Sequence, residues 1–248
     1  MTQENKVVHY YHADANALGG YLHRPITQPI DVQSPVSLSP VGGVSHVRNG
    51  RFQLLSIVTA DATESQVSGS PNRLTGCPET MAVSKVEGLN VLHMVSADLV
   101  VGQILSSHPK DGGAARVTFA GTQFQGLKVT GHEVKVKLDL DIFDHVKHIQ
   151  KRGFPSEPAI RHSKFLNKVP RKSRNEDCIR TSLVTEISGY PGGISDNALD
   201  VPGLGTVYLA ELLVSPVSYR LIMMRIELGC PTQGSMTAAA AKVNGGGH

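Results

Sequence analysis

Apolar and polar residues alternate most regularly between Arg116 and Ile142. From Val134 to Ile142 every second residue is apolar, and the residues between them are lysine or aspartate. A period of two is typical of a β-strand with one buried and one solvated face. The turn sequence Thr130-Gly131-His132 precedes this run, and its glycine suits the positive φ of a tight turn. The pattern predicts a hairpin between residues 127–129 and the strand that follows.

Similar runs predict further strands before and after this hairpin. Val91 to Leu105 fits both strand and helix spacing, and its valine content favours a strand. In Phe52 to Thr63 the expected core residues are Phe52, Leu54, Ile57 and Val58. The remaining strands are expected at Thr181–Ile187, Thr206–Val214 and Tyr219–Leu228.

Leu221 to Met224 is apolar at four consecutive positions. Such a run is typical of a strand that is covered on both faces. A second layer of the same subunit and a partner subunit are the two alternatives for the cover.

Prolines divide the N-terminal fifty residues at Pro25, Pro29, Pro35 and Pro40. Proline fixes φ and donates no backbone hydrogen bond, so this density excludes a helix and disfavours a central strand. We expect residues 1–50 to form an extended arm. The arm either wraps over its own domain as edge structure or reaches a neighbouring subunit.

A strongly basic segment follows the central hairpin. Between Lys147 and Arg174 nine basic residues stand against Glu157 alone, a net charge of 9 − 1 = +8, whereas the whole chain carries +3. Asp144 and Ser156 are suitable N-caps for short helical turns. We therefore expect a partly helical insertion over residues 144–178. Its candidate contacts for anions or partners are Lys147, Lys151, Arg152, Arg161, Lys164, Lys168, Arg171, Lys172 and Arg174.

Together these patterns predict an all-β fold, a mainly antiparallel sandwich or barrel. We expect residues 51–143 and 179–235 to form one β domain and residues 236–248 to form a flexible tail. The 25 glycines and 14 prolines agree with the many turns that such a fold needs. The three cysteines are widely spaced and odd in number, which argues against a disulfide framework. The first residues have no signal-peptide pattern and no apolar run approaches a membrane span, which predicts a soluble cytoplasmic protein, with signal-less export as the alternative.

Three stretches resemble segments of uncharacterised β-rich bacterial proteins. They are Val86–Leu92, Val117–Phe124 and Val201–Leu209. The resemblance implies a β-rich fold, and no activity or functional residue comes with it.

Enzyme motifs are mostly absent: there is no G-x-S-x-G, no P-loop and no H-E-x-x-H. Glu211 and Glu227 on neighbouring strands suggest paired carboxylates, although the surface charges of a hairpin explain them equally well. No catalytic residue and no cofactor is predicted.

Histidines are the main chemical lead. Asp144 with His145 and His148, and Asp14 with His9 and His12, each combine H-x-x-H with a carboxylate. Two histidines three residues apart share a face on a helix, where they can hold one divalent metal, but not on a strand. This geometry favours His145 and His148 over His9 and His12, because the latter lie in an extended segment.

The leading functional hypothesis is a non-enzymatic protein that assembles with copies of itself into a homo-oligomer. The first alternative is a metal-dependent or small-molecule-processing enzyme that uses the histidine clusters. The second is nucleic-acid binding through the basic insertion, which Phe154 and Phe165 alone would support by stacking.

Overall fold

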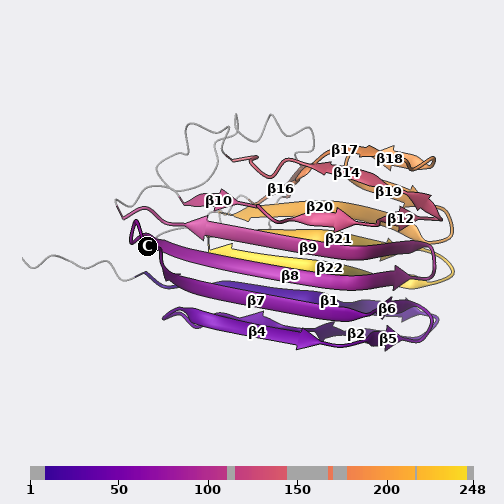
Figure 1. Cartoon of the computed structure of the whole chain (residues 1–248). Coiled ribbons are helices and arrows are strands. Elements are labelled where there is room, and N and C mark those ends of the chain that lie inside the picture. The colour runs from indigo at the N-terminus through magenta and orange to yellow at the C-terminus, as the bar shows by residue number, and fades with distance from the viewer. Residues whose placement is uncertain (1–8, 111–114, 144–166, 170–177, 216, 245–248) are drawn as a thin grey trace, which may run out of the picture.

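The computed structural model describes residues 9–110, 115–143, 167–169, 178–215 and 217–244. These residues form an all-β structure in which two antiparallel sheets of ten strands each pack face to face (Figure 1). The all-β, antiparallel prediction is confirmed, and the sandwich is the form that it takes. The expected helical turns of the basic insertion lie outside the described residues, apart from Asn167–Val169, which is a strand.

The first sheet, sheet A, has the strand order β15-β16-β20-β21-β22-β1-β2, with β18 and β19 beside β20 and β3 beside β1. Its strands are β1 (Ala13–Arg24), β2 (Gln28–Gln33), β3 (Val36–Ser37), β15 (Asn167–Val169), β16 (Cys178–Ser182), β18 (Gly193–Ser195), β19 (Ala198–Val201), β20 (Gly205–Ser215), β21 (Ser218–Leu228) and β22 (Gln233–Asn244).

The second sheet, sheet B, is built around β7, β8 and β9, with β4 on one side and β10, β11 and β12 following each other along the other. Its strands are β4 (Gly43–Asn49), β5 (Phe52–Leu54), β6 (Val58–Ala60), β7 (Ala62–Pro71), β8 (Pro78–Val91), β9 (Val95–Ser107), β10 (Arg116–Thr118), β11 (Gln123–Gln125), β12 (Lys128–Val129) and β13 (His132–Glu133). A separate pair consists of β14 (Lys135–Leu138) and β17 (Val184–Ser188).

The predicted central hairpin exists in a shorter form. Val129 pairs with His132 across a two-residue turn in which Thr130 and Gly131 have φ of 49° and 81°. Positive φ at both turn residues is typical of the type I′ hairpin. The alternating run after it does not continue this hairpin, because β14 pairs with β17 instead. The strand pair from Phe52 is confirmed as β5 and β6.

The expectation of a separate N-terminal arm is wrong for the residues before Pro25. Ala13–Arg24 is an interior strand, which pairs with β22 on one side and with β2 and β3 on the other. Its buried residues include Ala13, Ala15 and Ala17, all apolar and small enough for the space between the sheets. The proline-rich residues after it form β2 and β3 at the border of sheet A, where a missing backbone donor is tolerated. The predicted flexible tail is likewise wrong up to Asn244, because β22 is a central strand.

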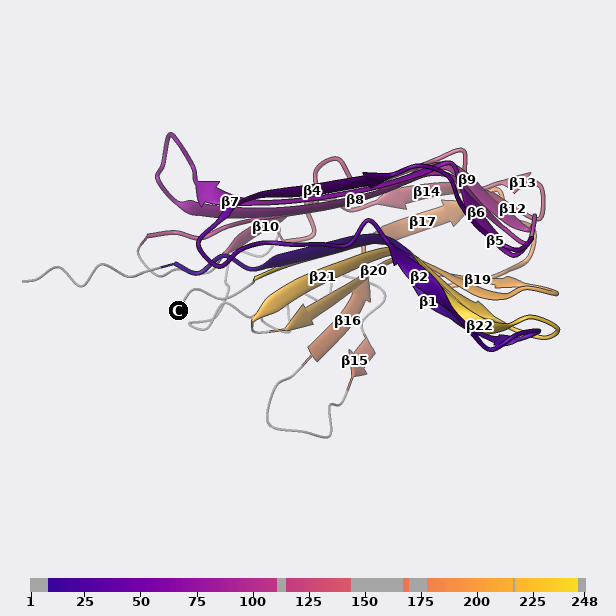
Figure 2. The ribbon, with the colours of Figure 1, turned by 90° about the horizontal axis from the view of Figure 1, so that it is seen from below.

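Sheet A bends along a row of four buried residues, Ala17, Ala239, Met223 and Ala210, on β1, β22, β21 and β20. Ala210 and Ala239 have φ of 47° and 54°, a conformation that L-residues rarely adopt. On each strand the alternation of inward and outward side chains shifts by one residue at this row, as it does at a β-bulge. In Figure 2, β1 and β22 turn partway along their length, and β2 follows them.

Backbone carbonyls at the bend accept hydrogen bonds from serine hydroxyls, in addition to those that Leu183 N–H donates to Ala210 and Asn197 Nδ2 to Leu209. The Ser84 hydroxyl donates to the carbonyl of Asn16 at 2.7 Å. The Ser182 hydroxyl lies 2.9 Å from the carbonyl of Leu209 and 3.0 Å from that of Ala210. Because buried backbone groups need partners, these serines stabilise the bend.

The run Leu221–Met224 is buried within this chain. Its four consecutive buried residues arise partly from the bend, because Leu221 lies before the change of face and Met224 after it. The first alternative, a cover from the same subunit, is therefore sufficient for this strand.

Candidate functional site

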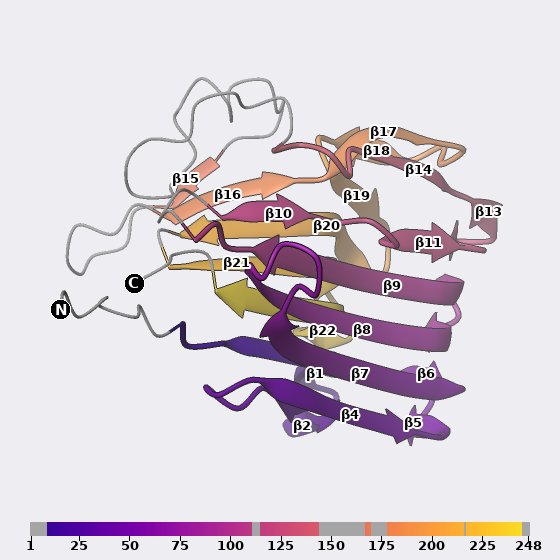
Figure 3. The ribbon, with the colours of Figure 1, turned by 60° about the vertical axis from the view of Figure 1, so that its left-hand side comes forward.

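The candidate site lies at the end of the sandwich where the described chain begins and ends (Figure 3). His9 precedes β1, His108 follows β9, and Asn244 is the last residue of β22. Strand direction explains the meeting, since β1 leaves this end while β9 and β22 arrive at it. Residues far apart in the sequence thus form one group, which we call the histidine cluster: His9, Thr80, Ser106, His108 and Asn244.

Side-chain contacts connect four members of the histidine cluster in series, and Thr80 joins them through the register of its strand. The rings of His9 and His108 have centroids 4.6 Å apart and are tilted by 48°. Ser106 Oγ lies 3.4 Å from His108 Nε2, and Asn244 Nδ2 lies 3.5 Å from His9 Nε2. Thr80 is the cross-strand partner of Ser106. Polar side chains therefore gather at this end of the core.

Most of the histidine cluster is buried, yet several of its polar atoms have no partner. The exposed fractions are 0% for Thr80 and Ser106, 4% for His108 and 8% for Asn244. Thr80 Oγ1, His108 Nδ1 and Asn244 Oδ1 have no hydrogen-bond partner among the described residues. Leaving a buried polar atom unpaired costs about 1–3 kcal/mol. Three such atoms in one cluster indicate a place for a further polar species.

Burial keeps the two imidazoles neutral. Burial, together with the nearby His9, lowers the pKa of His108 from 6.5 to about 4. The backbone of Asn244 partly opposes this lowering. Burial also lowers the pKa of His9. Both rings are therefore uncharged at neutral pH and can act as acceptors or metal ligands.

His9 and His12 do not form the predicted pair. His9 lies against His108 and Tyr11, whereas His12 is exposed and its Nε2 lies 3.2 Å from Asp14 Oδ2. Residues three apart in an extended segment point to opposite faces, as the sequence indicated. His145, His148 and Asp144 lie outside the described residues, and so do all the basic candidates except Lys168 in β15. No three His, Cys, Asp or Glu side chains of the described residues form a metal-binding group.

Sequence reasoning missed His108 and Asn244. Every second residue of β9 from Val100 to Ser106 points inward. If this alternation continues, the next inward residue is His108. Asn244 gave no signal, since it follows a run of alanines that was interpreted as a tail.

Glu211 and Glu227 do not form a catalytic pair, because Arg225 lies between them. Glu211 is 5% exposed, which contradicts its interpretation as a surface charge. Its two oxygens accept from Nε and Nη2 of Arg225 at 2.6 and 2.9 Å, and Glu227 accepts from Nη1. The Arg225 guanidinium also lies 3.8 Å from the ring centroid of Tyr208. Although burial opposes its charge, the two carboxylates raise the pKa of Arg225 above its ordinary value.

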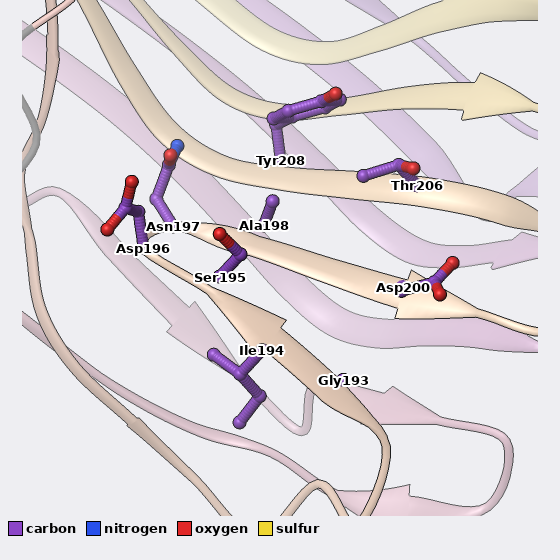
Figure 4. Close-up of a pocket in the computed structure, with 9 residues that line it drawn as sticks. All are labelled: Gly193, Ile194, Ser195, Asp196, Asn197, Ala198, Asp200, Thr206 and Tyr208. Atoms are coloured by element: carbon purple, nitrogen blue, oxygen red, sulfur yellow. The ribbon is translucent and has the colours of Figure 1, made fainter.

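A hollow of about 470 Å³ lies beside this ion pair, between the β18–β19 hairpin and β20 (Figure 4). Gly193 and Ala198 leave room for it, because neither extends a long side chain. Asp196 and Asp200 stand at opposite ends of the hairpin and do not converge. The hollow offers separate polar groups to solvent, without the paired carboxylates that acid–base catalysis uses.

These features define an all-β sandwich with a buried polar cluster at one end. The chain belongs to the family described as Domain of unknown function (DUF8256), whose model matches residues 9–175 and 146–215. The resemblance to uncharacterised proteins is therefore confirmed. No curated protein and no solved structure matches the chain. Within the described part of the chain, no helix is long and apolar enough to span a membrane.

Proposed function

We propose that this protein is a non-enzymatic, self-assembling interaction protein whose subunits meet at one edge of the sandwich. The observation that carries the proposal is the position of its exposed apolar side chains. Among the described residues, six of the ten exposed large apolar side chains fall between residues 21 and 55. They form what we call the N-terminal edge: Tyr21, Ile26, Val32, Val41, Val44 and Leu55.

The N-terminal edge includes the border strands of both sheets. In Figure 3, β2 of sheet A and β4 and β5 of sheet B lie at the same side of the sandwich. Among the described residues, β2 pairs with β1 alone and β4 with β7 alone. Each of these strands has a row of backbone groups that a further strand can pair with.

The two border strands differ in how well they are protected. Proline and charged residues at a strand edge discourage pairing with another chain. β2 contains Pro29 and Asp31, whereas β4 has seven residues and no proline. The charge of Arg48 in β4 is engaged within its own sheet, at 2.9 Å from Glu64 on β7. We therefore assign the contact to β4, with Val41 and Val44 beside it.

The proposed partner is a second copy of this chain, because each subunit has the same β4 edge and the β4 strands of two subunits can pair with each other. A contact of this kind combines backbone hydrogen bonds with apolar side chains. Val41 is 87% exposed and Val44 is 70% exposed, so burying them removes apolar surface from water. The proposal replaces the extended arm of the sequence analysis with a border strand.

Light scattering coupled to size-exclusion chromatography tests the proposal. We expect a dimer or larger assembly for the wild type and a monomer for the double variant Val41→Lys/Val44→Lys. Both side chains are exposed, so the substitutions should leave the fold intact, as circular dichroism can verify. Leu74→Lys is the matched control, because Leu74 is 96% exposed on the turn between β7 and β8.

Two results would contradict the proposal at different points. A monomeric wild type at high concentration would reject self-assembly altogether. An assembly that persists in the double variant would reject the β4 contact while leaving self-assembly in place. Deleting residues 1–40 is no test, because it removes the interior strand β1.

A further inference from the structure

The histidine cluster has a composition that few buried sites share: neutral imidazoles and unpaired oxygen atoms without a carboxylate. Ordinary cores avoid such groups or pair them. Here Thr80 Oγ1, His108 Nδ1 and Asn244 Oδ1 are unpaired among the described residues. A species that accepts electron pairs from several of these atoms would remove the cost of burying them.

We infer that the histidine cluster binds one divalent transition-metal ion, with His9 and His108 as nitrogen ligands and the Asn244 side-chain oxygen as a third ligand. The inference does not rest on the proposed self-assembly, because it uses different residues, although the two sites lie close together: Tyr11, whose ring centroid is 4.9 Å from that of His9, donates its backbone N–H to Pro40 O at 3.0 Å, next to Val41. The site also differs from the predicted pair of His9 and His12, since only His9 belongs to it.

The spacing of the two rings suits a shared ion. A metal–nitrogen bond to histidine is about 2.0–2.1 Å long, so the centroids of two imidazoles on one ion lie within roughly 6 Å of each other. The observed separation of 4.6 Å falls within this limit. Asn244 is fixed beside the segment that carries His9, because its backbone N donates to His12 O at 2.9 Å and its side-chain Nδ2 donates to Tyr10 O at 3.3 Å.

The ligand types select the metal. Imidazole nitrogen suits zinc, nickel and copper, whereas magnesium and calcium prefer carboxylates and other oxygen ligands. The described members of the cluster include no carboxylate. The lowered pKa values of His9 and His108 favour the neutral rings that a metal requires. Three protein ligands leave one tetrahedral position for water.

The consequence of binding is structural. His9 stands before β1, His108 after β9 and Asn244 at the end of β22, so one ion would join both sheets and the segment entering β1. Because only the folded chain brings these ligands together, the metal stabilises the native state.

Titration of the untagged full-length chain with single metals tests the inference. After treatment with a chelator and dialysis, the protein should bind one equivalent of Zn²⁺ or Ni²⁺ by calorimetry. Its thermal midpoint should rise by several degrees, and Mg²⁺ should have no effect. His9→Asn and His108→Asn should each weaken Zn²⁺ binding at least tenfold.

His12→Asn is the matched control, because His12 is three residues from His9 but points to solvent. It should bind Zn²⁺ like the wild type. His9 is only half-buried, so His9→Asn remains a test if His108→Asn fails to fold. The inference is overturned if the wild type binds no Zn²⁺, or if His12→Asn abolishes binding that His9→Asn retains.

Discussion

The middle of the sandwich and its histidine end satisfy their polar groups by opposite means. At the bend of sheet A, backbone carbonyls accept hydrogen bonds from Ser84 and Ser182, and the buried Glu211 is paired with Arg225. At the histidine end, three buried polar atoms remain unpaired among the described residues. Among the described residues, the middle contains one unpaired buried atom, Ser65 Oγ on β7, whereas three such atoms gather at the histidine end.

The difference separates stability from function. A complete network loses stability whenever one member is removed, because its partner is left buried and unpaired. An incomplete cluster can gain stability from what it binds or lose it with pH. We therefore expect substitutions in the middle to act under all conditions, and changes at the end to depend on metal and pH.

Removing the buried carboxylate at the bend should have the largest effect. The side chain of Glu211 is 6% exposed and that of Arg225 is 17% exposed. Breaking a buried ion pair by removing one partner costs about 3–5 kcal/mol. We expect Glu211→Ala to lower the free energy of unfolding by about this amount, measured by denaturation in urea.

The control is the exposed ion pair of β14 and β17. The side chains of Lys137 and Glu186 are 71% and 52% exposed. Exposed pairs contribute about 0–1 kcal/mol, so Glu186→Ala should change stability little. Equal losses in the two variants would show that the buried pair is not a special stabilising element of the bend.

Acidification should destabilise the histidine end next. In the folded state the pKa of His108 is about 4, against 6.5 for an ordinary histidine. Between these values the unfolded chain binds more protons, so stability decreases as pH falls from about 6.5 towards 4. A pKa difference of this size corresponds to roughly 3 kcal/mol, at about 1.4 kcal/mol per unit.

The measurement compares urea denaturation at pH 7 and pH 4.5 in the presence of a chelator. We expect the wild type to lose more stability between these pH values than His108→Asn, which cannot titrate at this position. His9 has a lowered pKa as well and adds to the loss in both proteins. An identical pH dependence of wild type and variant would contradict the assignment.

The sequence predicted the fold class because alternation is a local signal. Strands such as β14 and β21 have patterns that depend only on their own residues and on one buried face. It did not predict β1 or β22, since alanine-rich strands have little contrast between faces. Ala13, Ala15 and Ala238 are buried because two sheets approach closely there, and that approach is set by distant strands.

The candidate site was predictable only in part. His9 was singled out, but its partners are ninety-nine and more positions away in the sequence, and strand order decides that they meet. The bend was not predictable, because Ala210 and Ala239 adopt positive φ without being glycine. Tertiary packing imposes that conformation against the local preference of the residue.

The smallest effect concerns the close approach of the sheets at the bend. Cα atoms of β22 come within 8 Å of those of β8 and β9, closer than the roughly 10 Å usual between packed sheets. A Cβ atom on Gly102 of β9 would lie 2.9 Å from both the carbonyl oxygen of Ala239 and Cγ of Met223. We expect Gly102→Ala to cost about 1–3 kcal/mol, as overpacking of a core does.

Gly50→Ala is the matched control, because a Cβ atom there would have no neighbour within 4 Å. Alanine restricts the unfolded chain more than glycine, so this variant should be neutral or slightly more stable. Both variants are compared by their midpoints in urea. If Gly102→Ala were as stable as Gly50→Ala, the two sheets could move apart at the bend to accept a methyl group. The close packing inferred for the middle of the sandwich would then be wrong.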